Sequence, residues 1–218
     1  MSTNCWARRR RTTIAVVNVA WGRPTALIAT GTPWMAVFTL LLLTQTGHFF
    51  EHVWQMVQLH ALGLTGSDAR GLIGQLDIEW VHFGWNAGVV ALLALLLIRF
   101  RSNKLLVFAC MFAAWHLVEH DVIMVTFLAT GIPGSPGLLA SGGAIGGGLP
   151  VSRPDLHFVY NLIETALIAA AFFWQVRADG ASQAQLAARA TTTSVSGEIA
   201  RDWSRSPTQP VSRSARMK

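Results

Sequence analysis

The sequence predicts an all-α, polytopic membrane protein: a bundle of four transmembrane helices with both termini in the cytoplasm. Hydrophobic residues make up 52% of the chain and charged residues only 13%, whereas a soluble domain is about 25% charged. The mean hydropathy is +0.41. Four apolar segments are long enough to cross a bilayer, and most Lys and Arg residues flank them. The length of 218 residues suits a single domain.

Residues 1–32 are predicted to form a basic N-terminal segment that is cytoplasmic or lies at the membrane interface. Residues 13–22 within it are apolar, but a spanning helix needs about 20 residues. Arginines before an apolar stretch are also typical of a signal peptide. The sequence alone therefore leaves a signal-like role for residues 13–22 open.

Residues 33–176 are predicted to form the transmembrane bundle, with Pro33 well placed at a helix start. Only residues 101–103 separate the second and third spans, so these two helices should be antiparallel neighbours. Residues 177–218 are polar and are predicted to form a disordered, basic, cytoplasmic tail. The four predicted spans are about 33–62, 71–100, 104–130 and 155–176.

The positive charges predict the orientation of the bundle in a cell membrane. Both ends of the chain and the short turn at 101–103 are rich in Lys and Arg, whereas the other two loops carry only Arg70 and Arg153. Cytoplasmic loops carry the excess of positive charge, so the loops with Arg70 and Arg153 should be extracytoplasmic. The net charge of +6 does not indicate nucleic-acid binding, because the basic residues flank apolar segments.

The pentapeptide His-x-x-Glu-His occurs twice, at residues 48–52 and 116–120, and both copies lie inside apolar segments. Ionisable side chains are costly within a bilayer and mark functional sites. The other two predicted spans also carry His and Glu. Residues three, four and seven apart share one helical face, so each span should present a polar stripe in its extracytoplasmic half. The stripes contain His48, Glu51 and His52; Glu79 and His82; His116, Glu119 and His120; and His157 and Glu164.

The doubled pentapeptide indicates a possible internal repeat, in which the first two spans correspond to the last two. The first halves of the two units match in His, Glu and His. The second halves match only loosely when the residues Glu79, His82 and Asn86 are compared with His157, Asn161 and Glu164.

These residue types predict a transition-metal site. Imidazole binds Zn, Cu, Fe and Ni, and carboxylates add oxygen ligands. Two His residues four apart can bind one ion, and Glu-x-x-His, the spacing of Glu79 and His82, occurs in di-iron bundles. We expect a dinuclear centre of iron or copper, with zinc possible, and we interpret Glu51 and Glu119 as catalytic or bridging groups. The predicted metal ligands are His48, His52, Glu79, His82, His116, His120, His157 and Glu164.

Three alternatives remain at this stage. The polar stripes could be a hydrogen-bonded interface between helices, although Asn and Gln would serve that purpose at lower cost. Histidines on facing helices also bind haem, but the neighbouring Glu residues do not suit a haem pocket. The metal site could belong to a non-enzymatic protein that handles metals or translocates protons or ions.

The predicted function is therefore a membrane metalloprotein, interpreted as a di-iron or copper oxidoreductase that acts on a lipophilic substrate. Membrane lipids surround such a protein, and the sequence indicates no nucleic-acid partner. An accessory subunit that binds partner membrane subunits is a further possibility.

Overall fold

The computed structural model describes residues 33–64, 68–72 and 79–205, with side chains as far as residue 189. The predicted N-terminal segment 1–32 lies outside the described residues, as do residues 65–67, 73–78 and 206–218. The described chain is helical. It contains α2 (Pro33–Met56), a short π-helix η1 (Val57–Ala61), α3 (Glu79–Arg99), α4 (Lys104–Thr130) and α5 (Arg153–Arg205). No strand occurs within these residues.

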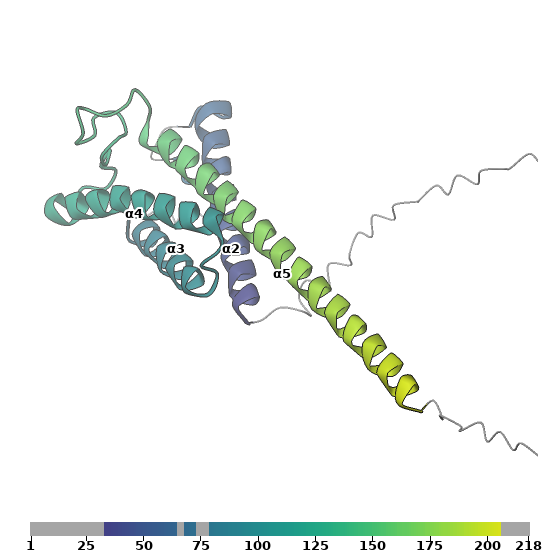
Figure 1. Ribbon diagram of the computed structural model, residues 1–218. Helices are drawn as coiled ribbons and strands as arrows, with labels where there is room; N and C mark the ends of the chain where they lie inside the picture. Colours follow the sequence, from purple (N-terminus) through teal and green to yellow (C-terminus); the bar gives the residue numbers. More distant parts are fainter. Residues whose placement is uncertain (1–32, 65–67, 73–78, 206–218) are drawn as a thin grey trace, which may run out of the picture.

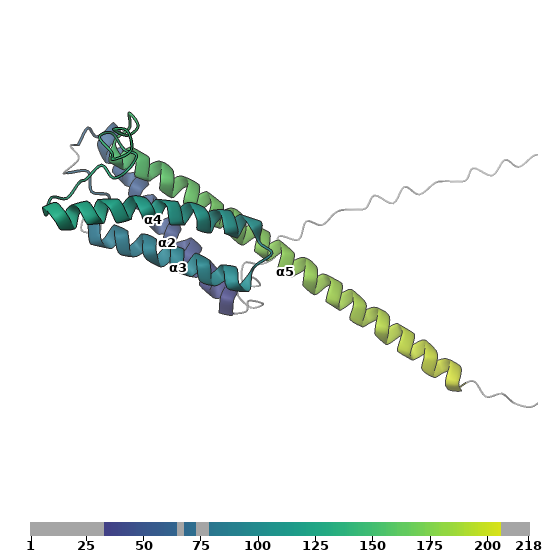
Figure 2. The same cartoon turned by 60° about the vertical axis from the view of Figure 1, so that its left-hand side comes forward.

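The four long helices form a bundle that α5 leaves as a single projecting helix (Figure 1). Helix α3 packs against α4, and α5 packs against both α2 and α4. Turning the molecule shows α3 and α4 side by side, joined by their short turn near the point where α5 leaves the bundle (Figure 2). The prediction that these two helices are neighbours is confirmed.

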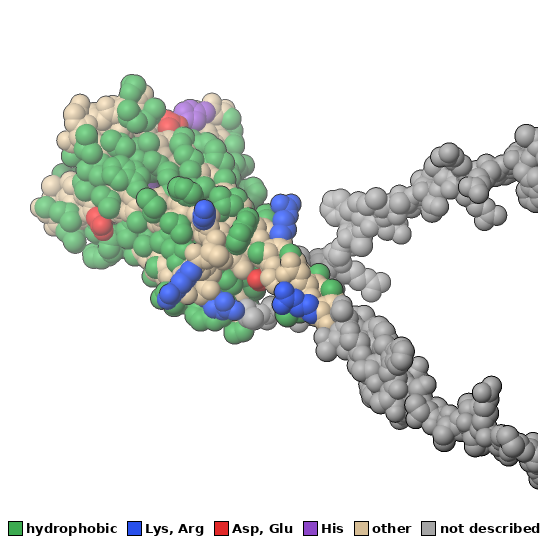
Figure 3. Space-filling model, viewed as in Figure 1, with side chains coloured by type: hydrophobic (Ala, Val, Ile, Leu, Met, Phe, Trp, Pro, Cys, Tyr) green, Lys and Arg blue, Asp and Glu red, His purple; other side chains and the backbone are tan. Residues whose placement is uncertain are grey.

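Three of the helices are long and apolar enough to cross a membrane: α3, α4 and the first part of α5, Arg153–Arg189. Helix α2 does not meet this measure, and its second half carries polar and ionisable residues. Membrane crossing by α2 and the cytoplasmic position of the termini therefore stay predictions. Hydrophobic side chains cover most of the bundle face shown in Figure 3, and Lys and Arg gather near the end from which α5 projects.

Local sequence explains the ends of α4. Asn103 begins the helix, because its side-chain oxygen accepts a hydrogen bond from the Leu106 N–H at 3.1 Å, and its amide group donates to the Ala171 carbonyl of α5 at 2.9 Å. Gly131 ends the helix with a φ of 69°, in the left-handed region that favours glycine. The same residue that starts α4 thus fixes α4 against α5.

Helix α5 continues beyond residue 176 to Arg205, into the segment for which the sequence predicted a disordered tail. Alanine, glutamine and arginine are frequent in the first part of this extension, and all three are strong helix formers. A helix that already has a packed first half needs no new nucleus to propagate. Low hydrophobicity alone is therefore a poor indicator of where this helix ends.

The bundle interior divides into an apolar half and a histidine-bearing half. The apolar half lies toward the α3–α4 turn and contains buried side chains from all four helices, including Phe38, Leu93, Leu106 and Phe172. The histidine-bearing half lies toward the start of α3 and α5 and the end of α4. Apolar packing in the first half fixes the four helices that position the histidines in the second.

Candidate metal centre

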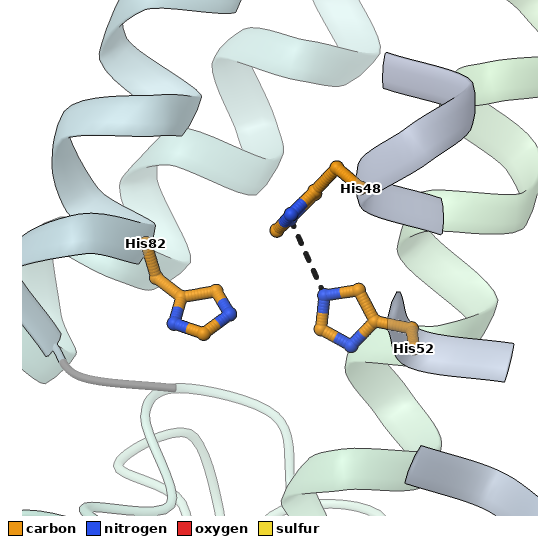
Figure 4. A group of neighbouring side chains, drawn as sticks. All are labelled: His48, His52 and His82. Atoms are coloured by element: carbon orange, nitrogen blue, oxygen red, sulfur yellow. Dashed lines mark hydrogen bonds between the residues drawn. The ribbon is translucent and has the colours of Figure 1, made fainter. Parts of the chain in front are cut away.

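Six of the seven histidines converge inside the bundle in two groups of three. The first histidine group is His48 and His52 of α2 with His82 of α3, and the second histidine group is His116 and His120 of α4 with His157 of α5. Within each group, one ligand atom from each residue lies within 4.8 Å of the others. Figure 4 shows the three rings of the first group turned toward one another from two helices. Each group could hold a metal ion.

The spacing of nitrogen atoms in both groups fits metal ligation. The Nε2 atoms of His48 and His52 lie 3.3 Å apart, and those of His116 and His120 also lie 3.3 Å apart. Two nitrogens that are each about 2.0–2.1 Å from a tetrahedral ion lie about 3.3 Å from one another. The i, i+4 spacing on a helix therefore places each histidine pair at the separation that one ion requires.

Hydrogen bonds from Nδ1 of His157 and His116 leave the Nε2 lone pair of each ring available to an ion. The Nδ1–H of His157 donates to the carbonyl of Arg153 at 2.9 Å, so Nε2 carries the lone pair. This buried Nε2 has no hydrogen-bond partner within the described part of the chain, and neither has Nδ1 of His52. The Nδ1–H of His116 donates to Oε2 of Glu164 at 2.8 Å. Such bonds fix a histidine in the tautomer that binds metal through its second nitrogen.

The two groups have matching surroundings. The Asn86 side chain donates to the His82 carbonyl at 2.8 Å, and Asn161 donates to the His157 carbonyl at 3.0 Å. An aromatic ring packs at a centroid distance of 5.0 Å on the first histidine of each i, i+4 pair: Trp85 on His48, and Tyr160 on His116. The three histidines, the aromatic residue and the asparagine of the first group thus each have a counterpart in the second group.

The signal for this correspondence is present in the sequence, in the pentapeptides His-Phe-Gly-Trp-Asn at 82–86 and His-Phe-Val-Tyr-Asn at 157–161. The repeat predicted from the sequence compared Glu79, His82 and Asn86 with His157, Asn161 and Glu164, and these residues match only loosely. The structure pairs His82 with His157 and Asn86 with Asn161, and leaves Glu79 and Glu164 without counterparts in the other unit.

Two of the predicted carboxylate ligands lie outside the histidine groups and bond to other residues. Glu79 forms a bidentate pair with Arg153, with both N–O distances 2.7 Å, and its Oε1 also accepts the Gly134 N–H at 3.0 Å. Glu164 accepts the hydrogen bond of His116. Direct ligation by Glu79 or Glu164 stays a prediction, and neither carboxylate is among the atoms that converge.

The two Glu residues of the His-x-x-Glu-His pentapeptides contact the loops that follow their helices. Oε1 of Glu119 accepts the N–H groups of Leu138 at 2.8 Å and Leu139 at 3.3 Å, and Oε2 is buried without a partner in the described residues. A Cβ atom at Gly137 would overlap Glu119, and one at Gly71 would overlap Glu51 in the same way. Both carboxylates thus lie against a glycine of positive φ, 74° and 81° respectively.

A cavity of about 700 Å³ adjoins both histidine groups. Four of the six histidines line it, whereas His48 and His116 lie behind them. The remaining lining is partly apolar, from Trp80, Phe127 and Pro133, and partly charged, from Arg70 and the Glu79–Arg153 pair. Trp80 is 54% exposed. A bound molecule could therefore contact both groups at once.

Sequence reasoning did not select Arg153 as part of the site. Two features of the sequence could have identified it. Arg153 is the only Lys or Arg in its loop, and it lies directly before Pro154 at the start of a segment that carries the predicted ligand His157. His60, the seventh histidine, received low weight in the sequence, and it lies apart from both groups, where its Nε2 is 2.6 Å from Oδ1 of Asp155.

No known protein family matches the chain, and comparisons with curated proteins and with solved structures find no match. The geometry of the two histidine groups and of the cavity beside them is therefore the basis for assigning a function.

Proposed function

We propose that this chain is an integral membrane metalloprotein whose two histidine groups bind a pair of transition-metal ions, and that it is an oxidoreductase for a lipophilic substrate. The observation that carries the proposal is the convergence of three imidazoles in each of two adjacent groups, with the 700 Å³ cavity beside both. Three protein ligands leave an ion an open coordination position. The cavity supplies the space from which a substrate reaches that position.

The donor set favours copper over iron. Di-iron bundles use carboxylates as direct ligands, but the converging atoms here are all imidazole nitrogens. Glu79 bonds to Arg153, and Glu164 bonds to His116. Imidazole suits copper and zinc, and copper adds the ability to exchange electrons. Two copper ions that each accept one electron could together oxidise a substrate by two electrons. Dioxygen would then be the final acceptor of these two electrons.

The residues of this chain have three roles in the proposal. The six histidines bind the ions, Glu164 orients His116, and Glu119 holds the loop that follows α4. Trp80, Phe127 and Pro133 form the apolar part of the cavity, which suits an apolar substrate that enters from the membrane or its surface. We also propose that the histidine-bearing half of the bundle is extracytoplasmic, because most Lys and Arg residues flank the other half.

The apolar half of the bundle argues against an ion-translocating protein. Buried Phe38, Leu41, Leu93 and Leu96 fill the interior between the histidines and the α3–α4 turn. An ion moving along the bundle would lose its ligands there, because these side chains offer no polar atoms. A site reached from one side only agrees better with an enzyme that binds its metal permanently.

Metal analysis of detergent-purified protein, together with optical and electron paramagnetic resonance spectra, tests the proposal. We expect about two equivalents of copper per chain and no haem band. Replacing His52 and His120 by Ala should remove most of the bound metal, whereas replacing His60, which lies outside both groups, should remove none. Two equivalents of zinc would indicate hydrolysis instead of oxidation, and folded protein that binds no added metal would contradict the proposal.

A further inference from the structure

We infer that the two histidine groups are unequal metal sites: the second group binds its ion more tightly and fills first, and Glu164 is the positioning residue that causes the difference. This inference rests on the proposed function. The convergence of the histidines indicates two metal sites, and the inference adds that their metal affinities differ.

The contact between Glu164 and His116 is the main observation. Oε2 of Glu164 lies 2.8 Å from Nδ1 of His116, and both side chains are fully buried. A carboxylate that accepts the Nδ1–H of a ligating histidine fixes its ring orientation and makes the ligating nitrogen more basic. His116 is therefore held ready to bind through Nε2, the atom 3.3 Å from Nε2 of His120.

The repeat shows that His48, the counterpart of His116, has no equivalent of this contact among the described residues. Glu164 lies seven residues after His157, and the residue seven after His82 is Val89, a buried apolar side chain. Within the part of the chain that the structure describes, no carboxylate bonds to His48, the counterpart of His116. At this one position, therefore, the second unit has a buried carboxylate where the first has an apolar side chain.

Burial and charge add to the difference. All three residues of the second group are buried, whereas His48 of the first is only half-buried. Glu119 beside the second group is fully buried, and Glu51 beside the first is half-buried. Charges attract a cation more strongly where water is excluded.

The expected size of the effect follows from the loss of such a hydrogen bond. Removing a carboxylate that orients a metal-binding histidine lowers metal affinity by about 10- to 100-fold. We therefore expect the second group to bind its ion at least about tenfold more tightly than the first.

Half-site variants separate the two affinities. His120→Ala with His157→Ala leaves only the first group, and His52→Ala with His82→Ala leaves only the second. Each protein, purified in detergent, is titrated with Cu(I) in competition with a coloured chelator of known affinity. Glu164→Gln is then added to both backgrounds, where the first-group background serves as the matched control.

We expect the second-group protein to bind Cu(I) more tightly, and Glu164→Gln to weaken binding by about 10- to 100-fold in that background but to leave the first-group protein unchanged. Equal affinities, or an equal effect of Glu164→Gln in both backgrounds, would overturn the inference while leaving the proposed function intact. Absence of Cu(I) binding by the folded wild-type protein would instead overturn the proposed function, and the inference with it.

A second measurement needs no histidine variant and covers the case in which the variants fail to fold. Tyr160 is the only tyrosine of the chain, and its ring centroid lies 5.0 Å from that of His116. Incorporated 3-fluorotyrosine therefore gives one fluorine signal beside the second group. Diamagnetic Cu(I) should complete the shift of this signal within the first equivalent. A shift that occurs mainly during the second equivalent would overturn the inference.

Discussion

The rings of His82 and His120 lie parallel, with 2° between their planes and 5.9 Å between their centroids. His82 belongs to the first histidine group and His120 to the second, so this stacked pair is the place where the two groups meet. His120 and His157 are also in contact within the second group, at 4.8 Å. Ions held by the two groups would therefore be close neighbours and would share the cavity.

This proximity predicts magnetic coupling between two bound Cu(II) ions. Protein loaded with one equivalent should give the full paramagnetic resonance signal of an isolated ion, and the second equivalent should lower the signal per copper. The measurement is a spin count against total copper at each step. His82→Ala should abolish the loss, because one group is then incomplete. A full spin count at two equivalents in the wild type would show that the ions do not interact.

The Glu79–Arg153 pair predicts a loss of stability without a loss of metal. Glu79→Gln leaves the Arg153 guanidinium, 20% exposed, without its bidentate partner, and we expect a cost of about 1–3 kcal/mol. Thermal unfolding in detergent measures this cost, and metal analysis measures the stoichiometry, which should stay at two. The double variant Glu79→Gln with Arg153→Gln is the control and should be less destabilised than Glu79→Gln alone. Loss of one metal equivalent in Glu79→Gln would instead identify Glu79 as a ligand.

The sequence predicted an all-helical fold of four long helices because long apolar runs have few alternatives. The segment 104–130 coincides with α4, and the polar stripe of each predicted span faces the bundle interior, as the burial of His52, His82, His116 and His157 shows. Helical periodicity carries this information directly. The three membrane-compatible helices were therefore accessible from composition and length.

Helical periodicity could not predict the bonding partners of the carboxylates. Periodicity places Glu79 on the same face as His82, but its partner Arg153 lies 74 residues away in the chain. Likewise, Glu119 shares a face with its histidines yet bonds to backbone N–H groups of the following loop. Which partner a carboxylate chooses depends on loop conformation, and the spacing of residues along a helix contains no information about it.

The predicted orientation can be tested with single cysteines. Cys5 and Cys110 are first replaced by Ser and Ala, and a cysteine is then placed at exposed Ser102, in the α3–α4 turn, or at exposed Ser141, in the loop after α4. Because α4 is long and apolar enough to cross a membrane, the two positions should lie on opposite sides. A membrane-impermeant maleimide should label Ser141→Cys in intact cells and Ser102→Cys only after permeabilisation. The reverse pattern would invert the topology, and labelling of both in intact cells would show that α4 does not cross.

The contact between Glu119 and Gly137 predicts a difference between two glycine substitutions in one loop. Gly134 and Gly137 have φ values of 89° and 74°, so Ala at either position costs about 1–2 kcal/mol in backbone strain. A Cβ atom at Gly134 meets nothing within 4 Å, whereas one at Gly137 would overlap the Glu119 carboxylate. Gly134→Ala is therefore the matched control for backbone strain alone.

We expect Gly137→Ala to be the more destabilising variant, by roughly a further 1–3 kcal/mol, because it displaces a carboxylate that accepts two backbone hydrogen bonds. The amides of Leu138 and Leu139, which donate to Glu119, should exchange with solvent faster in Gly137→Ala than in Gly134→Ala. Thermal unfolding and hydrogen exchange followed by mass spectrometry measure the two effects. If both variants lose the same stability and the two amides keep their protection, then Glu119 does not hold this loop over the metal centre, and its buried carboxylate must be assigned another role.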